Sequence, residues 1–279
     1  MSNKIIYIAE LDADVDDVIA IEYLHGMGLL EHVVLDPIPV EKLGKQRLQM
    51  IEDMGILTMN SLSGDCENVF CGGQLTEIAR HIKSGGTIKN LVLQGGFVGA
   101  NIMPFDQQLK KFKGKDAVRT FNFNCDVVAT DFVLKTTEKQ IGHIYCVGKN
   151  VCHNPINSDG HLWKGSPYHD LFKKYDVRNG KLQHDMLACH EGIVMLGLGE
   201  HVDVKAPFCN YLNVRPFNTG LNGNKTAWGS RHECERTGYR IVCSAITFTK
   251  DIECRISGLS FDRFKKNQSE SSNLVNKRN

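Results

Sequence analysis

The sequence predicts an α/β protein with a mostly parallel central sheet flanked by helices. Short apolar runs alternate with helical patterns, which is typical of parallel strands joined by helical crossovers. The chain has 279 residues, 42% of them hydrophobic, which is enough for a sizeable core. The first apolar run, at residues 4–9, leads into a cluster of acidic residues. A crevice opens at such strand ends in an open α/β sheet.

The elements follow from the apolar pattern in chain order. Ile5, Ile6, Tyr7 and Ile8 form the first strand, and an apolar helical pattern from Val18 onward follows it. We expect strands at residues 4–9, 32–36, 68–71, 90–95, 118–122, 141–147, 201–205 and 209–214, with a late pair at 226–233 and 239–248. We expect helices at residues 16–28, 40–54, 74–84, 105–112, 126–136, 167–174 and 184–197. Ser, Gly, Asn and Asp at 57–68 indicate a connector.

The chain is expected to form one large domain with a tail. Residues 1–264 carry the alternating pattern and are the expected single domain. Residues 265–279 are rich in Lys, Asn and Ser with scarcely any apolar side chain, so their burial would not repay the entropy of ordering. We therefore predict a disordered tail.

Composition argues against several classes of protein. The net charge is +1 without a concentrated basic stripe, so there is no clear nucleic-acid footprint. No stretch approaches the roughly 18 apolar residues of a membrane span, and the N-terminus does not read as a secretory signal. The 10 cysteines are scattered without CxxC spacing, which favours reduced, mostly buried thiols over disulfides or a zinc site. These observations predict a cytoplasmic protein with no membrane partner.

The segment after the first strand carries the strongest functional signal. Five acidic residues lie within residues 10–17, namely Glu10, Asp12, Asp14, Asp16 and Asp17. Like charges crowded at a strand end repel one another unless a hard divalent cation, which prefers oxygen ligands, neutralises them. The first three share one face of an extended chain, while Asp16 and Asp17 begin the helical pattern. The alternative is a solvated acidic turn.

A second acidic position opens the late helical pattern. Asp185 follows His184 there, and its alternative role is that of a first-turn acid stabilised by the helix dipole. Gly or Asn follows several intervening strands, and glycine lets the backbone approach a ligand or make a tight turn. These segments are Phe70–Thr76, Leu91–Gly96, Asn101–Pro104 and Thr120–Asp126.

In this order the segments resemble the inosine-uridine nucleoside hydrolase family. The family opens with a strand and Asp-x-Asp-x-x-x-Asp-Asp, where this chain has Glu-x-Asp-x-Asp-x-Asp-Asp from Glu10 to Asp17. Gly73–Thr76 is similar to the family's Gly-Pro-Leu-Thr turn, and His184-Asp185 to its late His-Asp pair. Further similarities lie at residues 38–43, 92–96, 101–104 and 121–122. The resemblance covers most of the chain and implies the family's fold.

The resemblance implies an N-ribosyl hydrolase that uses Ca²⁺. Its implied ligands are the carboxylates of Asp12, Asp17 and Asp185 and the main-chain carbonyl of Gly72, an oxygen set that suits calcium. Asp12 would also take the proton of a metal-bound water as general base. The hydroxide would then attack the anomeric carbon through an oxocarbenium-like transition state.

The substrate contacts and partners are implied in the same way. Asp16, Asn122 and Asp185 would hold the ribose 2′- and 3′-hydroxyls, and Asn101 would reach the 5′-hydroxyl. His184 is the candidate to protonate the departing base, because its ordinary pKa is close to neutrality. A buried histidine beside a helix start is the alternative for His184. The implied substrate is a small nucleoside-like molecule, and relatives are commonly homodimers or homotetramers.

Three departures from the family bear on the substrate. Thr120 stands where the family has a ribose-binding glutamate, and Pro37 stands where an asparagine of the metal and ribose shell is expected. The segment between Asp36 and Gly72 is much shorter than in relatives. We expect an open pocket that admits a bulkier substrate, such as a modified nucleoside, a nucleotide or an oligonucleotide end.

Two other functions stay open at the level of sequence. A catalytically impaired pseudo-enzyme or ligand-binding protein of the same fold would keep the aspartates while losing polar groups at Pro37 and Thr120. A Mg²⁺-dependent phosphatase of the haloacid dehalogenase type would use Asp12 as nucleophile, since Leu11–Val15 fits that family's opening motif. The Ser or Thr, the Lys and the late acidic pair that such a phosphatase needs have no convincing arrangement.

Overall fold

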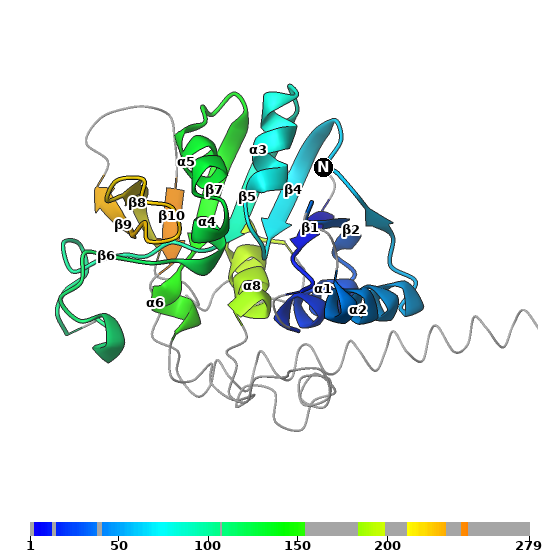
Figure 1. Ribbon diagram of the computed structural model, residues 1–279, viewed down its shortest axis with the longest axis horizontal. Helices are drawn as coiled ribbons and strands as arrows, with labels where there is room; N and C mark the ends of the chain where they lie inside the picture. The colour runs from blue at the N-terminus through cyan, green and yellow to red at the C-terminus, as the bar shows by residue number, and fades with distance from the viewer. Residues whose placement is uncertain are drawn as a thin grey trace, which may run out of the picture.

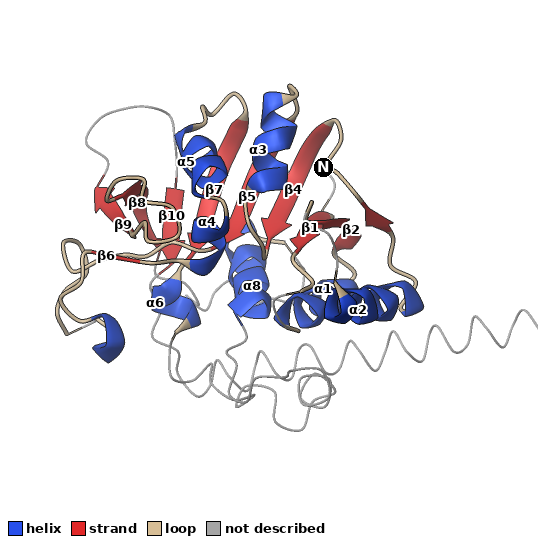
Figure 2. Cartoon of the chain, viewed as in Figure 1, coloured by secondary structure: helices blue, strands red, loops and turns tan. Residues whose placement is uncertain are grey.

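The described part of the protein is an α/β fold with helices on both faces of one sheet (Figures 1 and 2). A computed structural model describes residues 3–12, 15–37, 41–106, 108–153, 184–198, 211–232 and 241–244. The predicted fold class, a mostly parallel sheet flanked by helices, is confirmed. No helix within these ranges is long and apolar enough to cross a membrane.

The sheet is parallel over most of its width. Its strands lie in the order β3-β2-β1-β4-β5-β7-β10-β8-β9-β6. The parallel strands are β1 (Ile5–Ala9), β2 (Leu30–Leu35), β3 (Thr58–Met59), β4 (Asp65–Cys71), β5 (Thr87–Gln94), β7 (Ile141–Val147) and β10 (Ile241–Ser244). The antiparallel strands at one side are β6 (Ala117–Val118), β8 (Tyr211–Asn218) and β9 (Trp228–His232).

Helices pack against both faces of the sheet. One face is covered by α1 (Asp16–Gly26), α2 (Lys42–Asp53), α8 (His184–Leu196) and the short α6 (Lys149–Cys152). The other face is covered by α3 (Thr76–Lys83), the short α4 (Phe121–Cys125) and α5 (Val127–Lys135). A 3₁₀ turn, η1 (Lys110–Phe112), lies in the long connection after β5.

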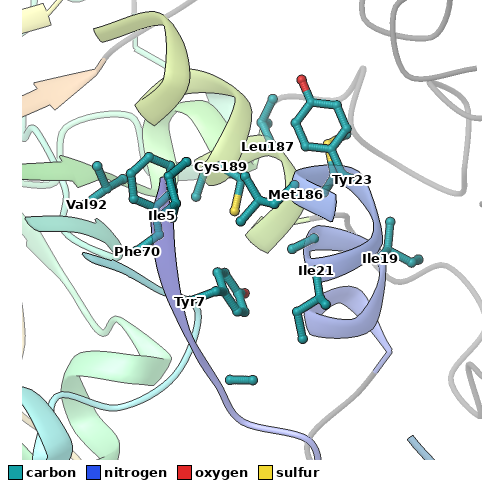
Figure 3. Packing of buried hydrophobic residues seen from close by; sticks show 14 of the residues in the cluster. Ile5, Tyr7, Ile19, Ile21, Tyr23, Phe70, Val92, Met186, Leu187 and Cys189 are labelled. Carbon is teal, nitrogen blue, oxygen red and sulfur yellow. The ribbon is translucent and has the colours of Figure 1, made fainter. Parts of the chain in front are cut away.

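The alternation of side chains along β1 explains the two cores. Tyr7 belongs to the cluster formed with α1 and α8, whereas Ile6 and Ile8 belong to the cluster formed with α3 and α5. Successive side chains of a strand point to opposite faces, so an unbroken apolar run is needed when both faces are covered. Figure 3 shows Tyr7 of β1 facing the space between this strand and α1.

The strand order reverses beside β1. This strand pairs in parallel with β2 on one side and with β4 on the other. Ligands of open α/β sheets bind in the crevice at the carboxyl ends of the strands where the order reverses. The fold therefore directs attention to the segments that follow β1 and β4.

Several predicted elements differ from those observed. The strand expected at 118–122 is limited to Ala117–Val118, because residues 121–125 form α4 instead. The Oδ1 atom of Asn124 accepts a hydrogen bond from the backbone N–H of Thr120 at 3.2 Å, which stabilises this helical turn. Of the helix expected at 105–112 only η1 forms within the described residues.

Other predictions fall where the structure describes nothing or little. The helix expected at 167–174, the strand expected at 201–205 and the tail at 265–279 lie outside the described residues.

The described cysteines agree with the expectation of reduced, mostly buried thiols. Among the six cysteines described as free, only Cys125 is exposed, and the others are buried.

Candidate metal centre

Three buried carboxylates meet where α1 and α8 begin. Asp16 and Asp17 lie in the first turn of α1, and Asp185 lies in the first turn of α8. Their exposed fractions are 2%, 3% and 5%, and one oxygen of each lies within 4.8 Å of the others. The structure therefore brings together acidic residues of two helices that are far apart in the chain.

Parallel packing of the two helices produces this convergence. The backbone N–H of His184 donates to Asp16 Oδ2 at 3.3 Å at the start of the pair. Further along, the Tyr23 hydroxyl lies 2.8 Å from Nδ1 of His190. Both N-termini thus point to the same place, and the positive end of each helix dipole stabilises carboxylates there.

Asp17 is held from β1 and from the turn that follows it. The Tyr7 hydroxyl donates to Asp17 Oδ1 at 2.9 Å, and the backbone N–H of Glu10 donates to the same oxygen at 3.3 Å. Burial raises the pKa of Asp17 well above its ordinary value, and the negative charge of Glu10 raises it further. Burial, followed by the charge of Asp17, also raises the pKa of Tyr7, so this phenol stays a hydrogen-bond donor.

Gly72 brings the end of β4 against the same group. A Cβ atom added at Gly72 would collide with the Tyr7 hydroxyl and would lie 2.6 Å from Asp17 Oδ1. The main chain can approach this closely only because glycine has no side chain. The Gly72 carbonyl already accepts a hydrogen bond from Asn122 Nδ2 at 2.5 Å, and its second lone pair can serve another partner.

Asn122 joins the ends of two neighbouring strands. Its amide nitrogen also donates to the backbone oxygen of Gln94 at 3.1 Å and to Gln94 Oε1 at 2.7 Å. A small hollow lies between these residues and α8, lined by Tyr7, Phe70, Cys71, Gly72, Val92, Gln94, Asp185, Ala188 and Cys189. The side-chain amide of Asn122 is therefore held at the carboxyl ends of β4 and β5.

The donor set fits a hard cation. Calcium binds oxygen atoms at about 2.3–2.6 Å, so ligands on opposite sides of one ion lie about 5 Å apart. The separations within the group, at most 4.8 Å, are compatible with that geometry. Carboxylate and carbonyl oxygens suit Ca²⁺ or Mg²⁺, whereas zinc sites more often use nitrogen and sulfur. Asp16, Asp17, Asp185 and Gly72 are thus the residues that could hold a metal.

Asp12 lies elsewhere in this structure. Its Oδ2 accepts from the backbone N–H of Glu41 and its Oδ1 from that of Gly44, each at 2.9 Å. These N–H groups belong to the start of α2, so the Asp12 carboxylate acts as a capping group there. It is not part of the three-carboxylate group formed by the described residues.

Asn101, Thr120 and His184 were the other residues expected to contact or act on the substrate. Asn101 is exposed and donates from Nδ2 to the backbone oxygen of Ser230 at 2.8 Å. Thr120 is buried at the start of α4, and its hydroxyl makes no hydrogen bond within the described structure. The His184 ring packs against His153, with ring centroids 4.9 Å apart.

Sequence reasoning missed three residues of the site. Tyr7 contacts Asp17 directly, and Gln94 binds Asn122. Asp36, just after β2, is buried, and its charge contributes to the raised pKa of Asp17. Asp36 and Gln94 are polar residues at the ends of apolar strands, which is a usable signal. Tyr7 gives no such signal, because aromatic residues are common within strands.

Comparison with known proteins identifies neither a family nor an activity. No model of a known protein family matches the chain. The chain is similar to an uncharacterized protein of Aquifex aeolicus (strain VF5), with 28% identity over 157 residues, 53% of this chain and 52% of the relative. The chain thus spans about half the length of this curated relative. The relative's description names no activity.

Proposed function

We propose that the protein hydrolyses the N-glycosidic bond of a ribosyl compound with the help of Ca²⁺. The observation that carries the proposal is the convergence of Asp16, Asp17 and Asp185 beside the Gly72 backbone. It lies next to the point where the strand order reverses, the usual place for a ligand in this architecture. The motif resemblance supplies the reaction type, and the geometry supplies an oxygen-lined site.

The proposed metal ligands follow from the observed group. The carboxylates of Asp16, Asp17 and Asp185 and the Gly72 carbonyl would hold the ion. A bound Ca²⁺ would lower the pKa of an associated water and so favour hydroxide as the nucleophile. Tyr7 would keep one oxygen of Asp17 oriented through its 2.9 Å hydrogen bond.

The chain's own polar groups would position the sugar. Carboxylates accept hydrogen bonds from hydroxyls, so Asp16 and Asp185 are suited to the ribose 2′- and 3′-hydroxyls. Asn122 is anchored at the ends of β4 and β5 and would contact the sugar from the sheet side. The proposed acid that protonates the leaving base is His184, whose backbone is fixed against Asp16.

The general base has two candidates. Asp12, which the family resemblance assigns to this role, would have to release the N–H groups of Glu41 and Gly44. Asp16 already lies in the group formed by Asp16, Asp17 and Asp185, which we call the acidic group, so it needs no such movement. The base must reach the proton that it abstracts, so geometry favours Asp16.

A metal-binding protein without hydrolytic activity is the second candidate. The observation that favours it is the engagement of Asp12 in capping α2, which removes the implied base from the site. The phosphatase alternative gains no support from this position, because it requires the same carboxylate as a free nucleophile.

The test is ribose release from a panel of purine, pyrimidine and modified ribonucleosides and their 5′-monophosphates. Each substrate is assayed with Ca²⁺ and with EDTA, using wild type, Asp185→Asn and the control Asp53→Asn. Asp53 is an exposed residue at the end of α2, so its charge can be removed without touching the site. We expect Ca²⁺-dependent release that Asp185→Asn abolishes and Asp53→Asn preserves. Calcium binding without any release would favour the non-hydrolytic candidate, and the absence of both would contradict the metal site.

A further inference from the structure

Two lysines converge on one histidine near the acidic group. Lys111 Nζ lies 3.4 Å from His153 Nδ1, and Lys149 Nζ lies 3.3 Å from His153 Nε2. Lys111 belongs to η1, Lys149 begins α6, and His153 follows α6. We call these three residues the Lys–His cluster. Figure 1 shows α6 next to α8, the helix that carries Asp185.

The hydrogen-bonding groups of the Lys–His cluster do not match one another. An ammonium group has three donors and no acceptor, and a neutral imidazole has one donor and one acceptor nitrogen. Both ring nitrogens of His153 face an ammonium group, so one of them presents an N–H to a donor, whichever tautomer forms. An acceptor placed between these groups would satisfy the surplus donors.

The charges of the cluster are also uncompensated within the described residues. Burial, followed by the charges of Lys149 and Lys111, lowers the pKa of His153 to about 3. Burial, followed by the charge of Lys111, lowers the pKa of Lys149, and Arg119 adds to that effect. Neither lysine forms a salt bridge with a carboxylate in the described structure. Like charges this close repel one another, and an anion bound between them would offset the repulsion.

The cluster adjoins the proposed catalytic group. The His153 ring packs on the His184 ring, with centroids 4.9 Å apart and planes inclined at 54°. The backbone N–H of His184 in turn donates to Asp16 Oδ2 at 3.3 Å. His184 therefore contacts the Lys–His cluster through its ring and Asp16 through its backbone N–H.

We propose that Lys111, Lys149 and His153 bind the terminal phosphate of a ribosyl 5′-phosphate. Phosphate oxygens accept charge-assisted hydrogen bonds from ammonium and imidazole donors, and a dianion balances two lysines. The substrate is then a nucleoside 5′-monophosphate, with the sugar at the acidic group and the phosphate on the far side of His184. The ribosyl half of this inference rests on the proposed function, whereas the phosphate subsite stands on the cluster itself.

The test measures binding by isothermal titration calorimetry with the full chain. The probes are inorganic phosphate, ribose 5-phosphate and ribose, which avoid any choice of base. The variants are Lys111→Gln and Lys149→Gln, and the control is Lys110→Gln. Lys110 is an exposed lysine in the same 3₁₀ turn, so this control removes the same charge one position away. Thermal unfolding of each variant establishes that it is folded.

Ribose 5-phosphate is expected to bind at least about 10-fold more tightly than ribose. Each of the two cluster variants should weaken its binding about 10-fold or more, the usual effect of losing a hydrogen bond to a charged group. Lys110→Gln should change it less than about 2-fold, because within the described structure Lys111 and not Lys110 contacts His153. Inorganic phosphate should show the same dependence on the two cluster lysines.

Two outcomes would overturn the phosphate subsite. One is equal affinity for ribose and ribose 5-phosphate, including the absence of binding by either sugar and by phosphate. The other is an equal loss of affinity in Lys110→Gln and Lys149→Gln, which would reduce the effect to overall charge. Lysine-dependent phosphate binding without ribose release from any panel member would preserve the subsite and contradict the proposed hydrolase.

Discussion

The Asp16 carboxylate accepts a hydrogen bond at 3.3 Å from the backbone N–H of His184, although 168 residues separate the two in the chain. This contact joins the N-terminus of α1 to that of α8 and brings Asp185 to Asp16 and Asp17. The candidate metal centre therefore depends on the packing of two helices, and variants that change the group should report on both stability and ion binding.

Asp17→Asn should stabilise the protein when calcium is absent and should reduce the stabilisation that calcium provides. Without metal, removing one buried negative charge relieves desolvation and the repulsion from Glu10, so the melting temperature should exceed that of wild type. With Ca²⁺ at 100 times its dissociation constant, wild type should gain about 2.7 kcal/mol, and the variant should gain far less. Thermal unfolding in EDTA and in Ca²⁺ measures both effects, with Asp53→Asn as the control. An equal calcium-induced gain in wild type and Asp17→Asn would contradict the ligand assignment.

Two substitutions at Asp12 should separate capping from catalysis. Asn retains one oxygen, which can accept from one of the two N–H groups, that of Glu41 or that of Gly44, whereas Ala retains none. Asp12→Ala should lower the free energy of unfolding by about 1 kcal/mol, and Asp12→Asn should lower it by less. If Asp16 is the base, Asp12→Asn should keep most of the ribose-releasing activity. Near-complete loss of activity in a stably folded Asp12→Asn protein would instead identify Asp12 as the base.

Gly72→Ala should be much more damaging than Gly73→Ala. A methyl group at Gly72 would displace the Tyr7 hydroxyl or Asp17, and overpacking of this kind costs about 1–3 kcal/mol. At Gly73 the nearest atoms are Glu10 Cβ at 3.0 Å and Asp36 Oδ2 at 3.1 Å, so a small shift of a neighbour suffices. Denaturant unfolding gives the stabilities, and calcium titration should show the larger loss of affinity in Gly72→Ala. Equal effects at the two positions would contradict the close approach at Gly72.

Glu22→Gln should stabilise the protein in a pH-dependent way. Burial raises the pKa of Glu22 to about 7, from an ordinary 4.5, and its Oε2 has no hydrogen-bond partner among the described residues. The folded state therefore holds a proton that the unfolded state has lost between pH 4.5 and pH 7. The contribution of Glu22 to the free energy of unfolding of the wild-type protein therefore falls as the pH rises from 4.5 to 7. Above pH 7 this contribution is constant.

The variant lacks this titration, so the comparison is direct. At pH 8 Glu22→Gln should exceed wild type by up to about 3 kcal/mol, since each pKa unit corresponds to about 1.4 kcal/mol. Below pH 4.5 the difference should disappear. Urea unfolding at pH 4, 6 and 8 measures the three values. A difference that does not grow with pH would show that Glu22 ionises freely in the folded protein.

Much of the fold was predictable because local patterns reflect burial. The run Ile5–Ile8 predicts a strand covered on both faces, and its side chains divide between two cores as that reading requires. The helix beginning at Asp16 was predicted from its apolar spacing and acidic first turn. The segment at 118–122 was predicted wrongly as a strand, because the hydrogen bond between Asn124 and the Thr120 backbone stabilises a helical turn.

The candidate site was predictable only in part. Asp17, Asp185 and Gly72 were expected to meet, and the structure places them together. Asp12 was expected among them, yet its carboxylate caps α2. A carboxylate near two possible sets of partners has no local signal that selects one, so the choice depends on where α2 packs. The calcium ion and the reaction stay predictions.

The sequence by itself determined the α/β class, the acidic segment after the first strand and the late helix that begins with Asp185. These are local properties, set by hydrophobic spacing and by the preference of helix N-termini for acids. The tertiary structure decided which of these groups share a site. It brought Asp16 to His184 across 168 residues and Lys111 to His153 across 42 residues. Such contacts join segments distant in the chain, so they arise from the packing of whole helices and strands and leave no pattern in the sequence around any one residue.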